Sequence, residues 1–239
     1  MRKSRKLVKQ FCAVSLAAVM GFSLMGVWGG SAQAEERTET NVAYGIVPTA
    51  RWLDGSEMTD GLDGEMDSNS APRATNGVYT DFYRYGENME EGGEAKPSYA
   101  QFDLKKNYDI SSIKMWRYYE DGREYTPTAI AVSESSDDWS DGNVDVIYNS
   151  DTDGIFGLGE GSDTGYAETA DGKEFICGDT VTGRYVRVYS LGSNVNTGNH
   201  IAEFEVYGNV HTQVPGKASV IFPEGEYEVI LEDGSESPM

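Results

Sequence analysis

The sequence contains few of the residues on which small exported folds and catalytic sites usually depend. Cysteine occurs twice in 239 residues, at Cys12 and Cys177, so a disulfide network cannot hold the fold together. Histidine also occurs twice, at His200 and His211, and neither has the spacing of a zinc site or of a nucleophile and its base. We therefore expect no catalysis by this chain, and we expect its stability to come from a sizeable hydrophobic core.

Basic residues are scarce as well. The chain has 19 Lys and Arg against 40 Asp and Glu. Residues 1–34 hold five of the basic residues and none of the acidic ones, so the remainder carries 14 − 40 = −26. Such a charge excludes nucleic acid and anionic membrane as electrostatic partners, because phosphate contacts require Lys or Arg. It is compatible with cation binding.

Long apolar runs are missing except near the start. Phe11–Val27 follows a basic segment and precedes Ala32-Gln33-Ala34, the pattern of a signal peptide cleaved after Ala34. We therefore expect a protein that is secreted or at the cell surface and has no membrane insertion after cleavage; a retained anchor is the alternative. Residues 35–40 are expected to be a disordered leader.

Segments with a helical period are also missing, and short segments with alternating apolar residues take their place. Arg184–Tyr189 and Ile201–Tyr207 alternate best and predict two antiparallel strands. The imperfect phase of Ile110, Ile113 and Met115 predicts a bulge or an imprecise strand boundary near Ser111. Further strands are expected at Asn41–Ala50, Tyr99–Leu104, Ile110–Tyr118, Ala129–Ser133 and Val144–Tyr148. The pattern predicts an all-β domain over residues 41–209, followed at 210–239 by a linker and the start of a further β domain or a tail.

Two polar loops are candidates for a ligand site. The loop at 190–200 is too long for a tight turn and offers amide and imidazole groups at Asn194, Asn196, Asn199 and His200. In the segment 118–125, Arg123 lies close to tyrosines, and a guanidinium can bind vicinal hydroxyls while an aromatic ring stacks on a sugar. The alternative is that Arg123 pairs with Glu120 or Asp121.

Two acidic loops are candidates for cation sites. Met58–Ser68 interleaves Asp and Gly, which lets side-chain and main-chain oxygens converge on calcium, with a plain Asx-turn loop as the alternative. The segment 149–169 contains Ile155, Phe156 and Leu158 and predicts a packed Ω-loop. Whether this segment binds a second cation through Asp151, Asp153 and Asp163 is left open.

Five segments in order resemble the coagulation factor V/VIII type C (discoidin) domains, closest to the bacterial family 32 carbohydrate-binding modules. They are Asp60–Glu65, Tyr99–Leu104, Ile130–Ser133, Arg184–Val188 and Glu203–Gly208. The resemblance implies a β-sandwich jelly roll of the galactose-binding-like type. It implies a structural calcium ion held by Asp60, Asp63, Ser68 and Glu203. It also implies a sugar site on the loops, for which the candidates are Arg123, Asn199, His200, Asn196, Tyr119, Tyr83 and Trp52.

The function implied is that of a non-catalytic carbohydrate-binding module. It would target a larger exported bacterial protein to glycans, with galactose-type and other terminal sugars as candidates, and its further partners would be other domains of the same chain. The alternative is a protein-binding or architectural adhesion module at the cell surface.

Overall fold

The computed structural model describes residues 39–60, 65–86, 94–140 and 142–212, and the backbone of two short strands at 229–230 and 236–237. The predicted signal peptide, its anchor alternative and most of the predicted leader and tail lie outside the described residues. Thr40, which we expected in the disordered leader, instead pairs with Gly208. Among the described residues, no helix has the length and apolarity needed to span a membrane.

The described chain consists of strands and one 3₁₀ helix. The elements are β1 (Thr40–Asn41), β2 (Thr49–Trp52), η1 (Ser68–Thr75), β3 (Tyr83–Tyr85), β4 (Ser98–Trp116), β5 (Thr128–Ser133), β6 (Asp145–Asn149), β7 (Lys173–Ser190), β8 (Asn199–Ile201), β9 (Glu203–Val210), β10 (Val229–Ile230) and β11 (Glu236–Ser237). The last two pair with each other. The all-β prediction is confirmed.

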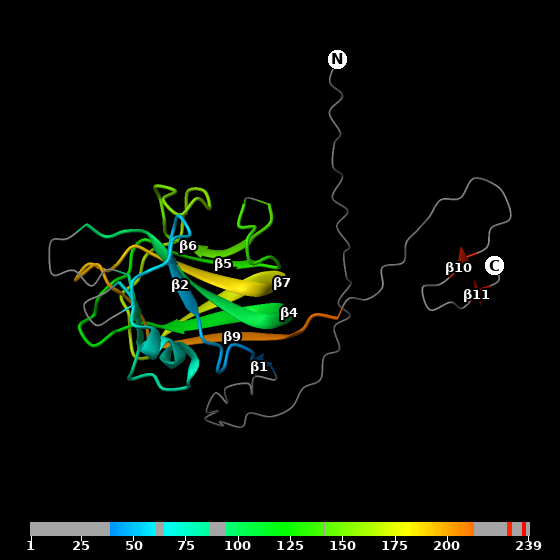
Figure 1. Ribbon diagram of the computed structural model, residues 1–239, viewed down its shortest axis with the longest axis horizontal. Helices are drawn as coiled ribbons and strands as arrows, with labels where there is room; N and C mark the ends of the chain where they lie inside the picture. Colours follow the sequence, from blue (N-terminus) through cyan, green and yellow to red (C-terminus); the bar gives the residue numbers. More distant parts are fainter. Residues whose placement is uncertain are drawn as a thin grey trace, which may run out of the picture. The chain divides into compact units, whose positions relative to one another are not determined.

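Two long strands, β4 and β7, run through both layers of the sandwich (Figure 1). In one layer the neighbouring strands are, in order, β2, the first half of β4, the second half of β7, β5 and β6. The second half of β4 lies between β9 and the first half of β7, and β1 extends β9. The register between β4 and β7 shifts between Asp103 and Tyr108, where Lys105 has a φ of 72°. Irregularities of this kind bend a strand, so one pair of strands supplies the middle of two facing sheets.

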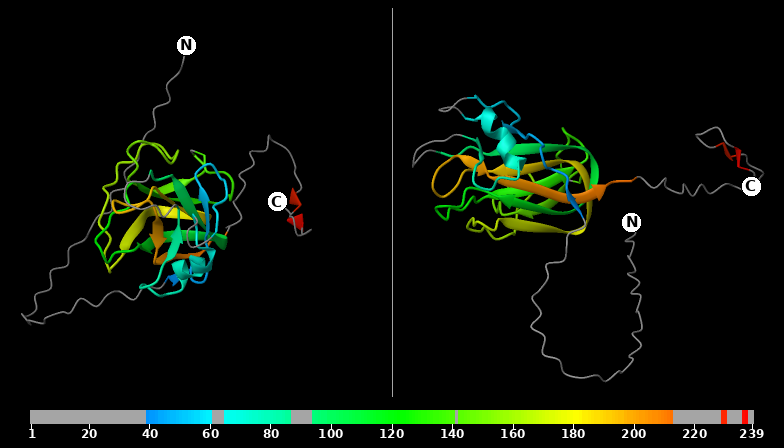
Figure 2. Two further views of the ribbon diagram at one scale, coloured as in Figure 1. Left: turned by 60° about the vertical axis from the view of Figure 1, so that its left-hand side comes forward. Right: turned by 90° about the horizontal axis from the view of Figure 1, so that it is seen from below.

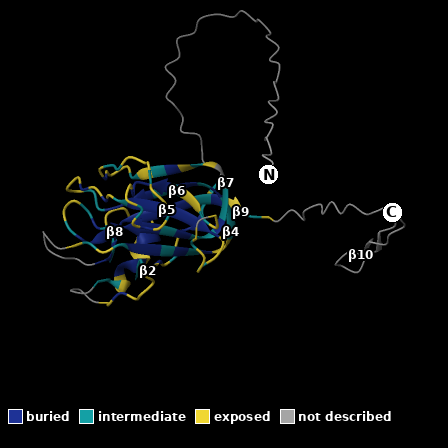
Figure 3. Cartoon of the chain, turned by 90° about the horizontal axis from the view of Figure 1, so that it is seen from above, coloured by how far each residue is buried: buried dark blue, intermediate teal, exposed yellow. Residues whose placement is uncertain are grey.

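The hydrophobic core lies between these sheets. Figure 3 shows the buried residues gathered along the strands and the exposed ones in the loops. Phe102 of β4 stacks on Phe204 of β9, with ring centroids 4.2 Å apart, and both side chains are fully buried. The alternation seen in the sequence is explained by this packing, because every second residue of a strand faces the partner sheet.

The pairing of β7 and β9 differs from the prediction. Arg184–Tyr189 and Ile201–Tyr207 are not antiparallel partners, because β4 lies between β7 and β9 and runs antiparallel to each. The loop at 190–200 therefore crosses from one sheet to the other instead of closing a hairpin. Tyr99–Leu104 and Ile110–Tyr118 belong to the single strand β4, and the predicted bulge is confirmed by the register shift between Ile110 and Ser112.

The predicted Ω-loop after β6 is confirmed. It packs on the outer face of the sheet through Phe156, whose ring lies 5.6 Å from that of Tyr189. Asp151 closes the loop, since its Oδ2 accepts the Phe156 N–H at 2.7 Å and its carbonyl accepts the Gly161 N–H at 2.7 Å. Asp153 and Asp163 are exposed.

The 3₁₀ helix η1 was not expected from the sequence. It packs on β3 and β9 at one side of the sandwich (Figure 2) and buries Ala71 and Ala74 in the core. Asn76 ends it, and the turn that follows enters the site described below.

We expect Phe204→Ala to lower the free energy of unfolding by about 3–5 kcal/mol, because it removes one of two rings that stack across the sandwich. Ile176→Ala is the control, since that side chain is 68% exposed. Urea unfolding of both variants measures the difference. Equal losses would show that the Phe102–Phe204 contact does not hold the sheets together.

Candidate functional site

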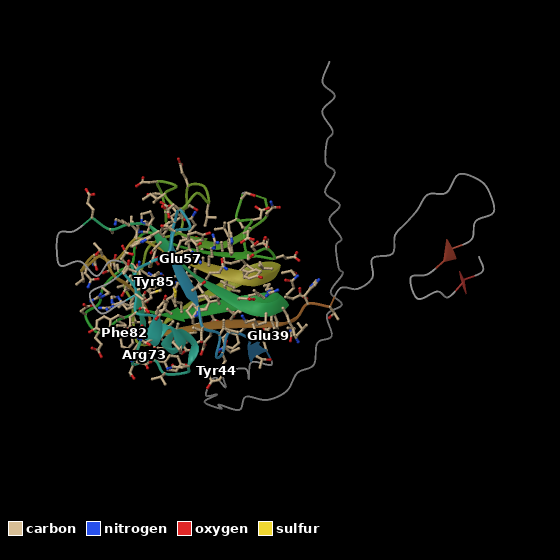
Figure 4. All side chains as sticks on the ribbon, in the orientation of Figure 1. Glu39, Tyr44, Glu57, Arg73, Phe82 and Tyr85 are labelled. Carbon is tan, nitrogen blue, oxygen red and sulfur yellow. The ribbon has the colours of Figure 1, made fainter. Side chains whose placement is uncertain are left out.

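The loops that could bind a ligand meet at one end of the sandwich. Ser98, Ser190 and Thr128 are neighbours in register, so the start of β4, the end of β7 and the start of β5 lie together. The strand β8 joins this end because Asn199 donates to the Ser98 hydroxyl at 3.1 Å. Figure 4 shows Phe82 at this loop end and Glu39 toward the other.

His200 lies at the centre of a cluster of rings. Its ring is 5.0 Å from that of Phe82 and 6.1 Å from those of Tyr118 and Tyr125. The Tyr125 hydroxyl lies 2.8 Å from His200 Nδ1. We call Phe82, Tyr118, Asp121, Arg123, Tyr125 and His200 the His200 cluster.

Arg123 joins the cluster as one half of an ion pair. Its Nε and Nη2 both donate to Asp121, at 2.9 and 2.6 Å, and its guanidinium carbon lies 4.6 Å from the centre of the Tyr118 ring. The structure therefore has the Asp121 pairing, which the sequence left open. Arg123 is only 7% exposed, so it shapes the loop and supports Tyr118 from behind.

The surface beside the cluster is a shallow depression between the Tyr79–Phe82 and Arg117–Glu120 segments. Phe82, Tyr118 and Tyr119 are half-buried there. Glu120 is exposed, and its Oε2 accepts a hydrogen bond from the Tyr118 hydroxyl at 3.0 Å. Aromatic faces beside carboxylate and hydroxyl groups are suited to a pyranose ring, which has apolar faces and a rim of hydroxyls.

Three residues predicted to contact the ligand serve the fold instead. Tyr83 is fully buried and stacks on Tyr85, with centroids 5.3 Å apart, because β3 turns it into the core. Asn199 is 1% exposed, and besides donating to Ser98 its Oδ1 accepts the Gly192 N–H at 3.0 Å. The Asn196 side chain accepts the Gly198 N–H at 3.2 Å, which closes a turn of the loop.

Trp52 lies outside the His200 cluster. It lines a separate groove of about 600 Å³ with Leu53, Asp54, Ser56, Lys96 and Pro97. The Lys96 ammonium lies 5.3 Å from the centre of the Trp52 ring. The predicted aromatic contacts Trp52 and Tyr119 therefore belong to two different surfaces.

Burial and neighbouring charges control the protonation of His200. Desolvation is the main cause that lowers its pKa from 6.5 to about 3, and Arg123, Arg117 and Arg84 act in the same direction. The imidazole is therefore neutral across the physiological range.

The predicted calcium ligands fall into two separate groups. Asp60 Oδ1 accepts the Ser68 N–H at 2.9 Å, and the Ser68 hydroxyl bonds the other oxygen of Asp60. Asp63 lies outside the described residues. Glu203 instead contacts the turn after η1, where its Oε2 accepts the Gly77 N–H at 2.8 Å. Gly77 has a φ of 78°, which favours glycine at this position.

The oxygen atoms around Glu203 fit a cation. Glu203 is fully buried, and its Oε1 and the Oδ1 of Asp81 are both buried without a hydrogen-bond donor. Desolvation, together with the charges of Glu205 and Asp81, raises the pKa of Glu203 to about 7 against the lowering effect of the Gly77 hydrogen bond. Carboxylate oxygens buried without donors are costly, and a hard dication bound by both side chains would compensate them, although the other oxygen of Asp81 lies 3.8 Å from Arg73 Nε. Within the described ranges no group of three or more acidic, His or Cys side chains is placed to hold a metal, so main-chain and amide oxygens of the turn would have to complete the shell.

Sequence reasoning missed Asp81, Phe82, Tyr118 and Tyr125. The segment Asn76-Gly77-Val78-Tyr79-Thr80-Asp81 combines an Asn-Gly turn with a carboxylate and could have been recognised as a candidate cation loop. Nothing local distinguishes Phe82 from Tyr83, although the first lies at the surface and the second in the core.

Behind the cluster, two side chains of opposite charge, Arg117 and Glu168, are buried. Arg117 is fully buried, donates to the Ser190 hydroxyl at 2.6 Å and lies 4.6 Å from the centre of the Tyr125 ring. Glu168 is 4% exposed, and desolvation raises its pKa to about 7 against the opposing charge of Arg117.

No protein-family model matches the sequence. No curated protein matches it either. Among solved structures, a family 89 glycoside hydrolase from Clostridium perfringens is 17% identical with a TM-score of 0.47, over 72% of this chain and 15% of that enzyme. A chitosan-binding module of a chitosanase/glucanase from Paenibacillus sp. IK-5 is 21% identical, with a TM-score of 0.43, over 71% of this chain and 99% of the module. The CBM32 of AlyQ in complex with 4,5-unsaturated mannuronic acid is 16% identical, with a TM-score of 0.45, over 68% of this chain and 95% of that module.

These similar structures include modules of the carbohydrate-binding family that the sequence resembles. The chain spans about 15% of the length of the glycoside hydrolase it matches. Likenesses at these identities and TM-scores do not decide what this chain binds.

We expect Glu168 to reduce the stability of the domain as pH rises from about 5 to 8, while His200, whose pKa is lowered from 6.5 to about 3, acts in the opposite direction below about pH 6.5. The pKa of Glu168 in the folded state, about 7, exceeds its value of 4.5 in the unfolded chain, so the folded state holds a proton that the unfolded state releases in this window. The contribution of Glu168 is on the order of 3 kcal/mol. In urea unfolding at several pH values, with chelator present, the free energy of unfolding should fall less steeply with rising pH for Glu168→Gln than for the wild type.

Glu160→Gln is the matched control, because Glu160 is exposed. Part of the slope should remain in Glu168→Gln, since Glu203 titrates in the same direction. Identical slopes for the wild type and Glu168→Gln would contradict the assignment.

Proposed function

We propose that this chain contains a non-catalytic carbohydrate-binding module whose ligand lies on the His200 cluster. The observation on which this depends most is the pair of half-buried rings, Phe82 and Tyr118, that lie beside a neutral His200 at the loop end. Rings present flat apolar faces to a sugar, the exposed Glu120 supplies hydrogen bonds at its edge, and His200, which is 6% exposed, would contribute through the small part of its ring that reaches solvent. The resemblance to carbohydrate-binding modules of family 32 supports the same class of ligand.

The charge of the domain restricts the glycan. Outside residues 1–34 the chain carries −26, and Asp121 neutralises Arg123 within the cluster. A neutral sugar, galactose-type among the candidates, is therefore favoured over a uronate or a sulfated sugar. A shallow site buries few ligand atoms, so the dissociation constant is expected in the range of roughly micromolar to millimolar.

The wider role is also part of the proposal. The basic and apolar start of the chain supports export, and the module would hold a larger exported protein at its glycan. A blank glycan array for the folded domain would favour the alternative, a protein-binding or architectural adhesion module.

We further propose that a structural calcium ion is held by Glu203 and Asp81, with oxygens of the Asn76–Asp81 turn. This set differs from the one expected from the sequence, in which only Glu203 recurs. When bound, the ion would neutralise the buried carboxylate of Glu203 and the half-buried one of Asp81, and would connect β9 to the turn that leads into Phe82. Calcium would then stabilise the surface on which the sugar lies without touching it.

Phe82→Ala and Tyr118→Ala should each weaken glycan binding about five- to tenfold, because each removes an aromatic face without changing the core. A glycan array identifies the ligand class, and calorimetric titration with methyl β-galactoside gives the affinities. Tyr185→Ala is the control, a half-buried tyrosine that pairs with Asp103 at the other end of the sandwich. If Tyr185→Ala weakens glycan binding as much as the other two variants, the glycan does not bind at the His200 cluster. Trp52→Ala then tests the separate groove.

Calcium should raise the melting temperature of the wild type, and Glu203→Gln should abolish this response. Asp60→Asn should leave it intact, because Asp60 bonds Ser68 in a different loop. The calcium affinity should fall between pH 8 and pH 6, since a proton competes for Glu203, whose pKa is raised to about 7. Melting curves with calcium and with chelator decide this. If Asp60→Asn abolishes the calcium response and Glu203→Gln retains it, calcium binds in the acidic loop at Asp60 and not at Glu203.

A further inference from the structure

The hydrogen bond between Tyr125 and His200 decides which nitrogen of the imidazole carries the proton. Tyr125 is 4% exposed, and its hydroxyl oxygen lies 2.8 Å from Nδ1. A neutral imidazole has one N–H donor and one acceptor nitrogen, and the partner of one nitrogen determines the role of the other. The direction of this bond therefore controls what Nε2 can offer a ligand.

The surroundings of the hydroxyl give the direction. A tyrosine hydroxyl has a single proton, and among the described residues His200 Nδ1 is the acceptor within hydrogen-bond distance of Tyr125. Burial raises the pKa of Tyr125, so the proton stays on the phenol. A buried hydroxyl proton without an acceptor would be costly. The hydroxyl therefore donates, Nδ1 accepts, and the imidazole proton lies on Nε2.

The charges around His200 favour the same state. Arg84 lies opposite His200 on β3, Arg117 follows β4, and Arg123 follows in the next loop, while Asp121 is the nearby anion and is held by Arg123. Three cations against one paired anion oppose a second proton on the ring. His200 is therefore a fixed donor at Nε2 and not a group that switches near neutral pH.

We propose that Tyr125 is a positioning residue that holds His200 with its proton on Nε2, so that the glycan site presents a permanent donor to an acceptor oxygen of the sugar. This inference rests on the proposed function for its ligand, but not for the tautomer. It narrows the ligand to sugars that place a hydroxyl, ring or acetamido oxygen against the imidazole.

Nuclear magnetic resonance of the protein labelled with ¹⁵N-histidine tests the tautomer directly. With two histidines in the sequence, His211 is an internal reference for the opposite state, because its Nδ1 lies 2.6 Å from Asp109 Oδ1 and must carry a proton to bond that carboxylate. At pH 7 we expect His200 to show an unprotonated Nδ1 and a protonated Nε2. In Tyr125→Phe the two nitrogen shifts of His200 should move toward each other as the tautomers mix.

Binding of methyl β-galactoside supplies the second readout. Tyr125→Phe should weaken it about tenfold, because part of the molecules lose the Nε2 donor, and the wild-type affinity should be constant from pH 5 to 8. Tyr148→Phe is the matched control, since it removes a buried hydroxyl that donates to the Thr164 carbonyl, away from His200.

Each outcome decides a separate part of the proposal. A proton on Nδ1 of wild-type His200, or unchanged shifts in Tyr125→Phe, overturns the positioning role whatever the protein binds. An affinity lowered equally by Tyr125→Phe and Tyr148→Phe shows a general structural effect and overturns the role of the donor. Absence of galactoside binding by the wild type counts against the proposed ligand, and with the expected shifts it leaves the tautomer assignment standing.

Discussion

The continuity of β4 and β7 through both sheets is the constraint on which the rest of the structure depends. Each strand pairs with the other over nearly its whole length, and the register shift after Asp103 turns both from one sheet into the other. Because the two strands form the middle of both layers, their ends determine where the loops emerge. Ser98 and Ser190 meet at one end, and the His200 cluster is built around that meeting point.

Desolvation is the common cause of the unusual chemistry at this end. His200 loses its affinity for a proton, while Glu168 and Glu203 gain affinity, and in each case burial is the leading cause. A neutral group is less costly to bury than a charged one. The site therefore consists of half-buried aromatic rings and a neutral imidazole that is 6% exposed, with Arg117 and two carboxylates buried in the interior.

The scarce arginines are engaged within the fold. Arg187 lies between the rings of Tyr99 and Trp139, with its guanidinium carbon 3.9 and 4.1 Å from their centres. Arg184 binds both carboxylate oxygens of Asp103. Arg123 pairs with Asp121, and Arg117 is fully buried and donates to the Ser190 hydroxyl, although its Nε and Nη1 are buried without a hydrogen-bond partner in the described part of the chain. In a domain with so many carboxylates, few cations are left for an anionic ligand, which agrees with a neutral glycan.

The sequence by itself determined parts of most of the long strands, the irregularity near Ser111 and the Ω-loop, because a period of two and turn residues are local signals, but it did not predict β3, β8 or the first half of β7. Only the tertiary structure decided that β4 separates β7 from β9 and that Tyr83 is fully buried while its neighbour Phe82 is half-buried. It also decided that Glu203 bonds Gly77, 126 positions earlier, and not the acidic loop at Asp60. Such choices depend on how two sheets pack, and the free energy of that packing comes from contacts between distant residues, which a local pattern does not encode.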